Sequence, residues 1–339
     1  MPPVTGSPAR LRAAVEAFAG CHLIVLGDLI LDEYLFGKPA RISREAPVLI
    51  LRFTEREVAL GGAANAANNV HALGARVTPI GVTGDDGAGD ELRQLFHGAG
   101  IPTEGIVTEP GRCTPVKTRI MAGGYQATRQ QIVRLDREPP AELLDSTESA
   151  LLARLTTLGA GARGIILSDY GYGTVTPRLQ ERVKAIAHRA QLPVVVDSRY
   201  DVPRFVGVTA ATPNEAELAQ LTGLPVDDEP SIEKAGRQLL DRLAARLLLV
   251  TRGSHGMVLV ERDGPSTFIP IHGTDEIADV TGAGDTVISV FTAALASDAS
   301  PLHAAVLANI AGGIVVMKRG TATVAIRELR DALATLPEA

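Results

Sequence analysis

The 339-residue sequence contains no tryptophan, and aromatic residues make up only 4% of it. Proteins that bind single-stranded nucleic acid stack the bases on aromatic side chains, so this composition argues against that function. No run of basic residues stands out, and the formal net charge is −6, from 33 basic and 39 acidic residues. We therefore expect neither a nucleic-acid partner nor an anionic membrane surface as partner.

Cysteine is also scarce. Cys21 and Cys113 lie far apart in the chain and have no metal-ligand spacing. This argues against a disulfide framework and a zinc site, and it fits a reducing compartment. The sequence has no apolar run of membrane-spanning length and no secretory signal pattern at its N-terminus. We expect a cytoplasmic protein.

Apolar residues make up 45% of the chain, which is enough for a large aliphatic core. Short apolar runs alternate with segments of helical spacing, and this alternation predicts an α/β fold in three layers, with helices on both faces of a mostly parallel sheet. The predicted strands are 22–27, 76–82, 164–168, 193–197, 207–211, 246–251 and 256–261. The predicted helices are 9–19, 61–73, 86–98, 141–158, 177–190, 214–222 and 230–244.

Two segments interrupt this alternation, 33–58 and 112–136. Both are too long for ordinary connections, and long insertions in compact domains are often lids or binding elements. We predict that they pair into a small β lid over the carboxyl edge of the main sheet.

The most informative segment is Asp279–Thr286 (Asp-Val-Thr-Gly-Ala-Gly-Asp-Thr), which an apolar helical run, Val287–Ala296, follows at once. A helix that begins in such a turn presents unpaired N–H groups to an oxyanion. The amides of Gly282, Ala283 and Gly284 would then stabilise a transferring phosphoryl group, and Asp285 would accept the proton of the attacking hydroxyl. The alternative for Asp285 is an aspartate that only caps its helix.

Other phosphate-binding motifs are absent from the sequence. No Gly-Lys-Ser/Thr follows the glycines, so the segment is not a Walker A loop, and no G-x-G-x-x-G follows the first predicted strand. Asp279 and Thr281 either shape the turn or hold a monovalent cation such as K⁺ beside it.

A second group of residues suits a polyhydroxy ligand. Gly61 and Gly62 allow close approach of the backbone, and Asn65 offers both a donor and an acceptor. Asp28 and Asp32 follow a predicted buried strand, at the usual location of sites in α/β sheets. The structural alternative for Gly61 and Gly62 is a turn that leads into a closely packed helix. For Asp28 and Asp32 it is that one acid stabilises a turn and the other faces solvent.

The segments at 214–217 and 251–256 each have two interpretations. Asn214 and Glu217 have the spacing of a capping box, and the same spacing suits hydrated Mg²⁺ near phosphates. The second segment is an ordinary connection between strands or a wall of a nucleotide site. In the latter case the nucleotide contacts are Thr251, Gly253, Ser254 and Gly256.

Basic side chains are concentrated in the two predicted lid segments. A solvent-exposed lid surface explains most of them. A subset that converges on a substrate phosphate would explain why an acidic protein places them there, and we assign Lys117 and Arg119 to that role.

Taken together, Gly61–Asn65, Asn214-x-x-Glu217 and Asp279–Asp285 resemble the motifs of the PfkB (ribokinase-like) carbohydrate kinases, in the same order and spacing. The resemblance covers about residues 20–327. It implies a ribokinase-like fold in one kinase domain over 1–339, ATP as phosphoryl donor, Mg²⁺, and Asp285 as the base. We also assign Asn309 to the ATP site.

Within this family the chain most resembles kinases that act on D-glycero-D-manno-heptose 7-phosphate. The stretches that carry this likeness are Gly27–Asp32, Arg41–Val48, Leu167–Tyr170 and Thr212–Asn214. The likeness implies transfer to the anomeric C1 hydroxyl, with Asp169 at the acceptor. The chain has Tyr172 and Arg199 where those kinases carry lysine.

These departures keep three alternatives open: a pfkB kinase for ribose, fructose or a fructose phosphate, one for a nucleoside, and a non-catalytic sugar-binding homologue. Lids of this family often mediate dimers, so we expect a homodimer through the lid. None of the seven histidines forms a His-x-Gly-His pattern, and we expect no adenylyl-transfer activity from this sequence.

Overall fold

The computed structural model describes residues 7–123, 130–273 and 278–336. Its main sheet has nine strands in the order β13-β12-β11-β10-β9-β8-β1-β4-β5. The strands of this sheet are β1 (His22–Gly27), β4 (Arg76–Gly84), β5 (Ile106–Glu109), β8 (Gly164–Asp169), β9 (Val194–Ser198), β10 (Ala210–Ala211), β11 (Leu247–Thr251), β12 (Met257–Glu261) and β13 (Thr267–Ile269). Only the pairings of β12 with β11 and with β13 are antiparallel; the other pairings of this sheet are parallel.

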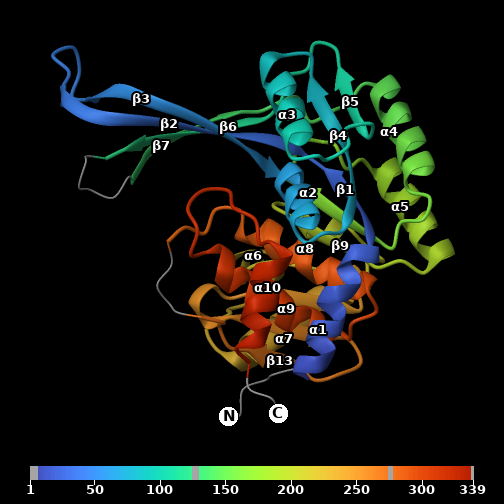
Figure 1. Cartoon of the computed structure of the whole chain (residues 1–339). Helices are drawn as coiled ribbons and strands as arrows, with labels where there is room; N and C mark the ends of the chain where they lie inside the picture. Colours follow the sequence, from blue (N-terminus) through green and yellow to red (C-terminus); the bar gives the residue numbers. More distant parts are fainter. Residues whose placement is uncertain (1–6, 124–129, 274–277, 337–339) are drawn as a thin grey trace.

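Helices cover both faces of this sheet, as expected for a parallel sheet whose strands are apolar on both sides (Figure 1). One face carries α1 (Pro8–Ala17), α2 (Ala63–Ala72), α3 (Gly87–Gly98), α8 (Ala283–Ala296), α9 (Pro301–Val315) and α10 (Ile326–Ala334). The opposite face carries α4 (Asp145–Leu158), α5 (Pro177–Ala190), α6 (Glu215–Thr222) and α7 (Glu229–Leu243). The predicted three-layer α/β architecture is therefore confirmed. Among the described helices, none is long and apolar enough to cross a bilayer.

The main differences from the sequence prediction lie at element boundaries and at short elements. Gly61 and Gly62 end a strand, and helix α2 begins only at Ala63. Gly62 has φ +56°, and a Cβ there would lie 2.8 Å from the carbonyl oxygen of Asp28, so the position requires glycine. The strand predicted at 207–211 is reduced to two residues, while β5, β13, α9 and α10 were not predicted.

The second sheet has four strands in the order β3-β2-β6-β7. They are β2 (Leu29–Ile42), β3 (Leu49–Gly62), β6 (Val116–Ala122) and β7 (Gln130–Arg137). The two outer pairings are antiparallel and the β2–β6 pairing is parallel. The predicted small β sheet is therefore present, and it projects away from the main body (Figure 1). Residues 124–129 of the predicted segment 112–136 lie outside the described residues. We call the four strands the projecting sheet.

A charged cluster joins the projecting sheet to helix α3. Arg56 on β3 contacts Glu33 on β2 at 2.6 Å and forms a two-point contact with Glu91 on α3 at 2.6 and 2.7 Å. Glu33 also accepts a hydrogen bond from the hydroxyl of Thr118 on β6. Such exposed pairs are individually weak, but this cluster links three strands to the main body.

The central strands carry the core, and this predicts where substitution is most destabilising. Leu249 on β11 is fully buried, so Leu249→Ala should lower the free energy of unfolding by roughly 2–5 kcal/mol through lost burial and cavity formation. Urea unfolding followed by circular dichroism measures this change. Leu144→Ala, at a side chain that is 51% exposed, is the matched control. Equal losses in the two variants would contradict the placement of the core.

Candidate active site

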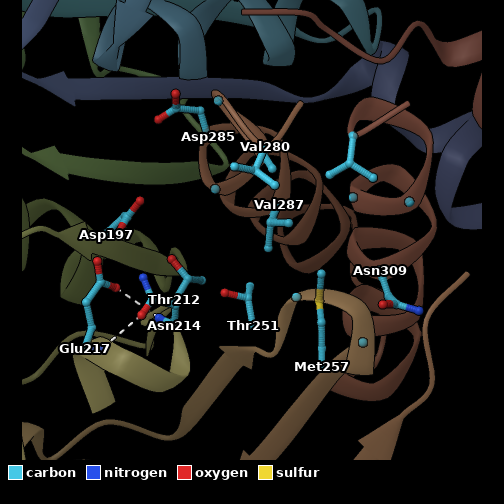
Figure 2. A pocket seen from close by; sticks show the side chains of 18 of the residues that line it. Asp197, Thr212, Asn214, Glu217, Thr251, Met257, Val280, Asp285, Val287 and Asn309 are labelled. Atoms are coloured by element: carbon cyan, nitrogen blue, oxygen red, sulfur yellow. Dashed lines mark hydrogen bonds between the residues drawn. The ribbon is translucent and has the colours of Figure 1, made fainter. Parts of the chain in front are cut away.

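A cavity of about 420 Å³ opens where β8, β9, β10 and β11 end and α8 begins. This is the carboxyl edge of the parallel strands, where sites in α/β sheets usually form. Figure 2 shows Asp285 and Asp197 on one side of the view, and Met257 and Asn309 on the other. The cavity thus has an acidic side and a largely apolar side.

The glycine-rich turn lines this cavity. Gly282 caps α8 with φ +77°, and a Cβ there would lie 2.6 Å from Asn65 Nδ2, so only glycine fits. The N–H of Ala283 already donates to the carbonyl of Val280 at 3.2 Å. Gly284 lies in the first turn of α8, where N–H groups have no partner within the helix. The predicted anion hole stays a prediction, and in this structure the amide of Ala283 already has a partner.

Asp279 shapes the turn, which was the first of its two predicted roles. Its Oδ1 accepts hydrogen bonds from the N–H and the hydroxyl of Thr281, at 2.9 and 2.7 Å, and its Oδ2 accepts one from the N–H of Gly320 at 2.9 Å. Burial opposes ionisation of this carboxyl, but these hydrogen bonds outweigh it and lower its pKa. The charged Asp279 thus ties the turn to the segment before α10.

Asp285 is buried at the start of α8 and is held from two sides. Asn65 Nδ2 donates to Oδ2 at 2.8 Å, and the hydroxyl of Tyr170 donates to Oδ1 at 3.1 Å. Burial raises the pKa of Asp285 to about 7, although both hydrogen bonds act in the opposite direction. A carboxylate whose pKa lies near neutrality can accept a proton and release it again, as a general base must.

The sequence analysis did not select Asp197, which faces the same cavity from β9. Burial, together with the nearby charges of Asp285 and Glu217, raises the pKa of Asp197 to about 8. A Cβ on Gly284 would lie 3.7 Å from its Oδ2, so this carboxylate sits beside the glycine-rich turn. The sequence did contain a signal for Asp197, because it is an acid at the end of a predicted apolar strand. The same pattern led us to select Asp28.

Asn214 and Glu217 form the predicted capping box. The Asn214 side chain accepts from the N–H of Glu217 at 2.9 Å, and the Glu217 carboxylate accepts from the N–H of Asn214 at 3.0 Å. The second carboxylate oxygen of Glu217 lies 3.8 Å from Arg199. Both side chains also line the cavity, so the capping role does not remove them from the predicted site.

The acidic side of the cavity fits Mg²⁺. Within the described residues, no three His, Cys, Asp or Glu side chains form a ready-made metal cage. Mg²⁺ at phosphate sites does not need one, because it keeps several waters and binds one or two carboxylates plus phosphate oxygens. Asp197 and Glu217 supply two such carboxylates, and their mutual repulsion favours a cation between them and a phosphate.

The predicted acceptor residues lie beside the cavity, at the base of the projecting sheet. Asp32 pairs with Arg119 at 2.6 Å, and its other oxygen accepts from the hydroxyl of Thr321 at 3.1 Å. A Cβ on Gly61 would lie 2.6 Å from Asp32 Oδ2, so this glycine makes room for the carboxylate. The sequence analysis missed Thr321, which follows the Gly320 that contacts Asp279.

Lys117 also belongs to this cluster. Its Nζ lies 4.3 Å from the ring centroid of Tyr170, a geometry typical of a cation–π contact. Burial lowers its pKa, and the nearby charge of Asp32 opposes that shift. Because the hydroxyl of Tyr170 donates to Asp285, this position brings Lys117 close to the predicted base.

Asp28 has a structural role. Its carboxylate is 1% exposed and accepts hydrogen bonds from the N–H groups of Tyr170, Tyr172 and Thr174 at 2.8, 3.1 and 3.1 Å. Burial raises its pKa, while these hydrogen bonds act against the rise. Asp28 orders the loop after β8, and its predicted contact with sugar hydroxyls stays a prediction.

Asp169 lines the cavity, but its carboxylate is engaged as well. It accepts from the hydroxyl of Ser198 at 2.6 Å and pairs with Arg204 at 2.9 Å. Asp169 is only 4% exposed. These contacts give it a structural role at the cavity wall, and its predicted contact with the acceptor stays a prediction.

The residues predicted to bind ATP mostly line the cavity. They are Asn214, Thr251, Gly253, Gly256, Gly282, Gly284 and Asn309. Ser254 is exposed and does not belong to the cavity wall that the structure describes. Asn309 donates to the carbonyl of Pro270 at 2.7 Å, so one of the two N–H groups of its amide is already used.

Solved structures with the same fold support the class to which this architecture belongs. Ribokinase from Arabidopsis thaliana, in complex with ribose and ATP, matches with a TM-score of 0.71 at 18% identity and covers 92% of this chain and 98% of its own. Phosphofructokinase-2 from Escherichia coli, in complex with substrates and products, matches with a TM-score of 0.75 at 19% identity over 93% and 98%. At these identities the comparison establishes a ribokinase-like fold.

The sequence match is more specific. Residues 22–328 match the family described as pfkB family carbohydrate kinase, so the chain belongs to the pfkB carbohydrate kinases. It is 42% identical over 319 residues to the bifunctional protein HldE of Geobacter sulfurreducens, covering 94% of this chain and 64% of that protein. The chain spans slightly less than two thirds of the length of such relatives.

The raised pKa of Asp285 makes stability depend on pH. The folded state keeps the proton up to about pH 7, whereas the ordinary pKa is 3.8. The destabilising effect of this carboxylate therefore grows as pH rises from about 4 to 7 and is constant above that range. Asp285→Asn should gain stability relative to the wild-type protein over that interval.

Urea unfolding at pH 5, 6, 7 and 8.5 measures this difference. The exposed Asp331→Asn is the control and should show no such trend. A difference between Asp285→Asn and the wild-type protein that does not change with pH would contradict the assigned pKa.

Proposed function

We propose that this protein is an ATP-dependent kinase that phosphorylates the anomeric C1 hydroxyl of D-glycero-D-manno-heptose 7-phosphate, which yields the 1,7-bisphosphate. The observation that carries this proposal is the position of Asp285. It lies at the start of α8, beside the glycine turn that lines the cavity, and contacts Asn65. Asn65 belongs to the predicted acceptor residues, here called the acceptor cluster, together with Asp32, Gly61, Lys117 and Arg119. One carboxylate thus lies between the two substrate sites.

The transfer step follows from this arrangement. The acceptor oxygen forms a bond to the γ-phosphorus of ATP while its proton passes to Asp285. The bond to the bridging oxygen breaks, and its electron pair leaves with ADP. The amides of Gly282 and Gly284 stabilise the charge on the transferring group.

The walls of the cavity suit the rest of ATP. Met257, Val287 and Val316 form apolar surface for the adenine, and Thr251 and Asn214 lie between them and the acidic side. When Mg²⁺ is bound, it neutralises charge on the triphosphate; Asp197 and Glu217 would hold it, in part through water. The turn at Asp279 and Thr281 would hold K⁺ beside the anion hole.

Charge and relatedness both support this choice of acceptor. Lys117, which lies over the ring of Tyr170, and Arg119, which pairs with Asp32, place two cations among the predicted acceptor residues, and this favours a sugar that already carries a phosphate. The identity of about 40% to HldE proteins supports a heptose phosphate over ribose or fructose. A nucleoside acceptor finds few aromatic side chains on which to stack. We place the reaction in the cytoplasm, where ATP is available.

Turnover with different acceptors tests this function. With ATP and Mg²⁺, heptose 7-phosphate should be turned over faster than ribose, fructose and fructose 6-phosphate in a coupled assay for ADP. Asp285→Asn should reduce turnover by at least about 10²-fold, because it removes the base, and should leave ATP binding largely intact. A variant that retains turnover within tenfold of the wild-type protein would overturn the role of Asp285.

We further propose that the protein is a homodimer through the projecting sheet. This sheet ends in the long edge strands β3 and β7, which carry exposed apolar side chains such as Phe53, Ile132 and Leu135. Long apolar edge strands associate unless another surface covers them. A second copy of the same sheet provides such a surface by symmetry.

A charge on the projecting sheet should separate the two copies. Phe53→Glu, at a side chain that is 65% exposed, should shift a dimer towards the monomer in light scattering coupled to gel filtration. Leu144→Glu places the same charge on an exposed leucine of the main body and should leave the mass unchanged. A monomeric wild-type protein at tens of micromolar would refute the dimer.

A further inference from the structure

Tyr170 contacts both the base and a cation of the acceptor cluster, and the transfer step described above does not use it. Its hydroxyl donates to Asp285 Oδ1 at 3.1 Å, and its ring lies 4.3 Å from Lys117 Nζ. It also lines the cavity proposed for ATP. Because the hydroxyl of Tyr170 contacts Asp285 at the wall of this cavity, the Tyr170 side chain affects whether a hydroxyl of water or of the acceptor reaches the base.

Access to Asp285 is narrow. The carboxylate is 4% exposed, and Asn65 occupies its Oδ2. A carboxylate oxygen can accept two hydrogen bonds, so neither oxygen is saturated, but the phenol of Tyr170, which lines the cavity, covers Oδ1. An acceptor hydroxyl that approaches Oδ1 from the cavity must therefore displace this phenol. The phenol and the acceptor hydroxyl compete for the same atom.

We propose that Tyr170 is a gate on the base: without an acceptor, its hydroxyl occupies Asp285 Oδ1 and prevents water from being activated for hydrolysis of ATP. The acceptor hydroxyl displaces the phenol and takes its place. This inference rests on the proposed kinase function, because it concerns ATP bound beside Asp285 before the acceptor arrives.

The reaction that the gate suppresses is a simple variant of transfer. A water oxygen would form the bond to the γ-phosphorus, its proton would pass to Asp285, and the electron pair of the broken bond would leave with ADP. The phenol does not replace water as nucleophile, because burial and the charge of Asp285 raise the pKa of Tyr170 well above its ordinary value. Tyr170 therefore stays a protonated donor.

The surroundings of Tyr170 indicate how the acceptor opens the gate. The backbone is fixed, because the N–H groups of Tyr170, Tyr172 and Thr174 all donate to Asp28. Displacement of the phenol therefore requires rotation of the Tyr170 side chain. The phosphate of the acceptor attracts the ammonium of Lys117 away from the ring, which removes the cation–π contact that holds the phenol in place.

Tyr170→Phe tests the gate, because it keeps the ring and removes only the hydroxyl. ADP release from ATP and Mg²⁺ without any sugar should rise by at least about tenfold, as expected when a general base gains access to water. The exposed Tyr200→Phe is the matched control and should match the wild-type protein. In the double variant Tyr170→Phe/Asp285→Asn the gain should disappear.

Two results would overturn the gate: sugar-independent ADP release within twofold of the wild-type protein, or a gain that persists in the double variant. Lys117→Met, which removes the cation from the ring, provides a second variant with an expected rise in the same assay. Each variant is also assayed with heptose 7-phosphate. Absence of sugar phosphorylation in the wild-type protein would refute the proposed function, whereas intact phosphorylation with unchanged hydrolysis would refute only the gate.

The pH profile distinguishes a gate from a ring that only fills space. The hydrogen bond from Tyr170 lowers the pKa of Asp285, which lies at about 7 in the wild-type protein. Acceptor turnover should rise with pH as Asp285 loses its proton. Because Tyr170→Phe removes this hydrogen bond, the midpoint of that rise should lie at a higher pH in the variant than in the wild-type protein. An unchanged midpoint would contradict the contact between the phenol and the base.

Discussion

A buried carboxylate between two hydrogen-bond donors is the interaction on which the site depends. Burial alone would keep Asp285 protonated, and the donors Asn65 and Tyr170 counter that effect, so that its pKa lies at about 7. The three residues come from α8, α2 and the loop after β8. The chemistry of one side chain thus requires that three distant segments keep their relative positions.

The packing of α2 against α8 provides this rigidity. The small residues of α2 allow the helices to approach closely, and buried polar contacts fix their register. Thr286 Oγ1 donates to Asn69 Oδ1 at 2.8 Å, and Ser289 Oγ donates to the carbonyl of Ala66 at 3.0 Å. Such contacts between helices fix the positions of the site residues more rigidly than loops alone would.

The parts of the site that follow from local chain geometry were predictable. The turn at 279–286, the capping box of Asn214 and the glycine pair before α2 all have short-range signatures, and the structure contains each of them. The role of Asp28 in ordering the loop after β8 was not predictable, because its hydrogen-bond donors lie more than 140 residues away. Asp197 was missed for a related reason, since its neighbours Asp285 and Glu217 come from other elements.

The amino-acid pattern therefore determined the layers, most of the order of the elements and the glycine turn, because hydrophobic periodicity and backbone freedom are properties of neighbouring residues. The family followed from the spacing of three motifs. The tertiary structure alone decided which carboxyl groups have a raised or lowered pKa, which hydroxyl contacts Asp285 and where the cations gather. These properties depend on burial and on contacts between remote segments, and no local pattern encodes them.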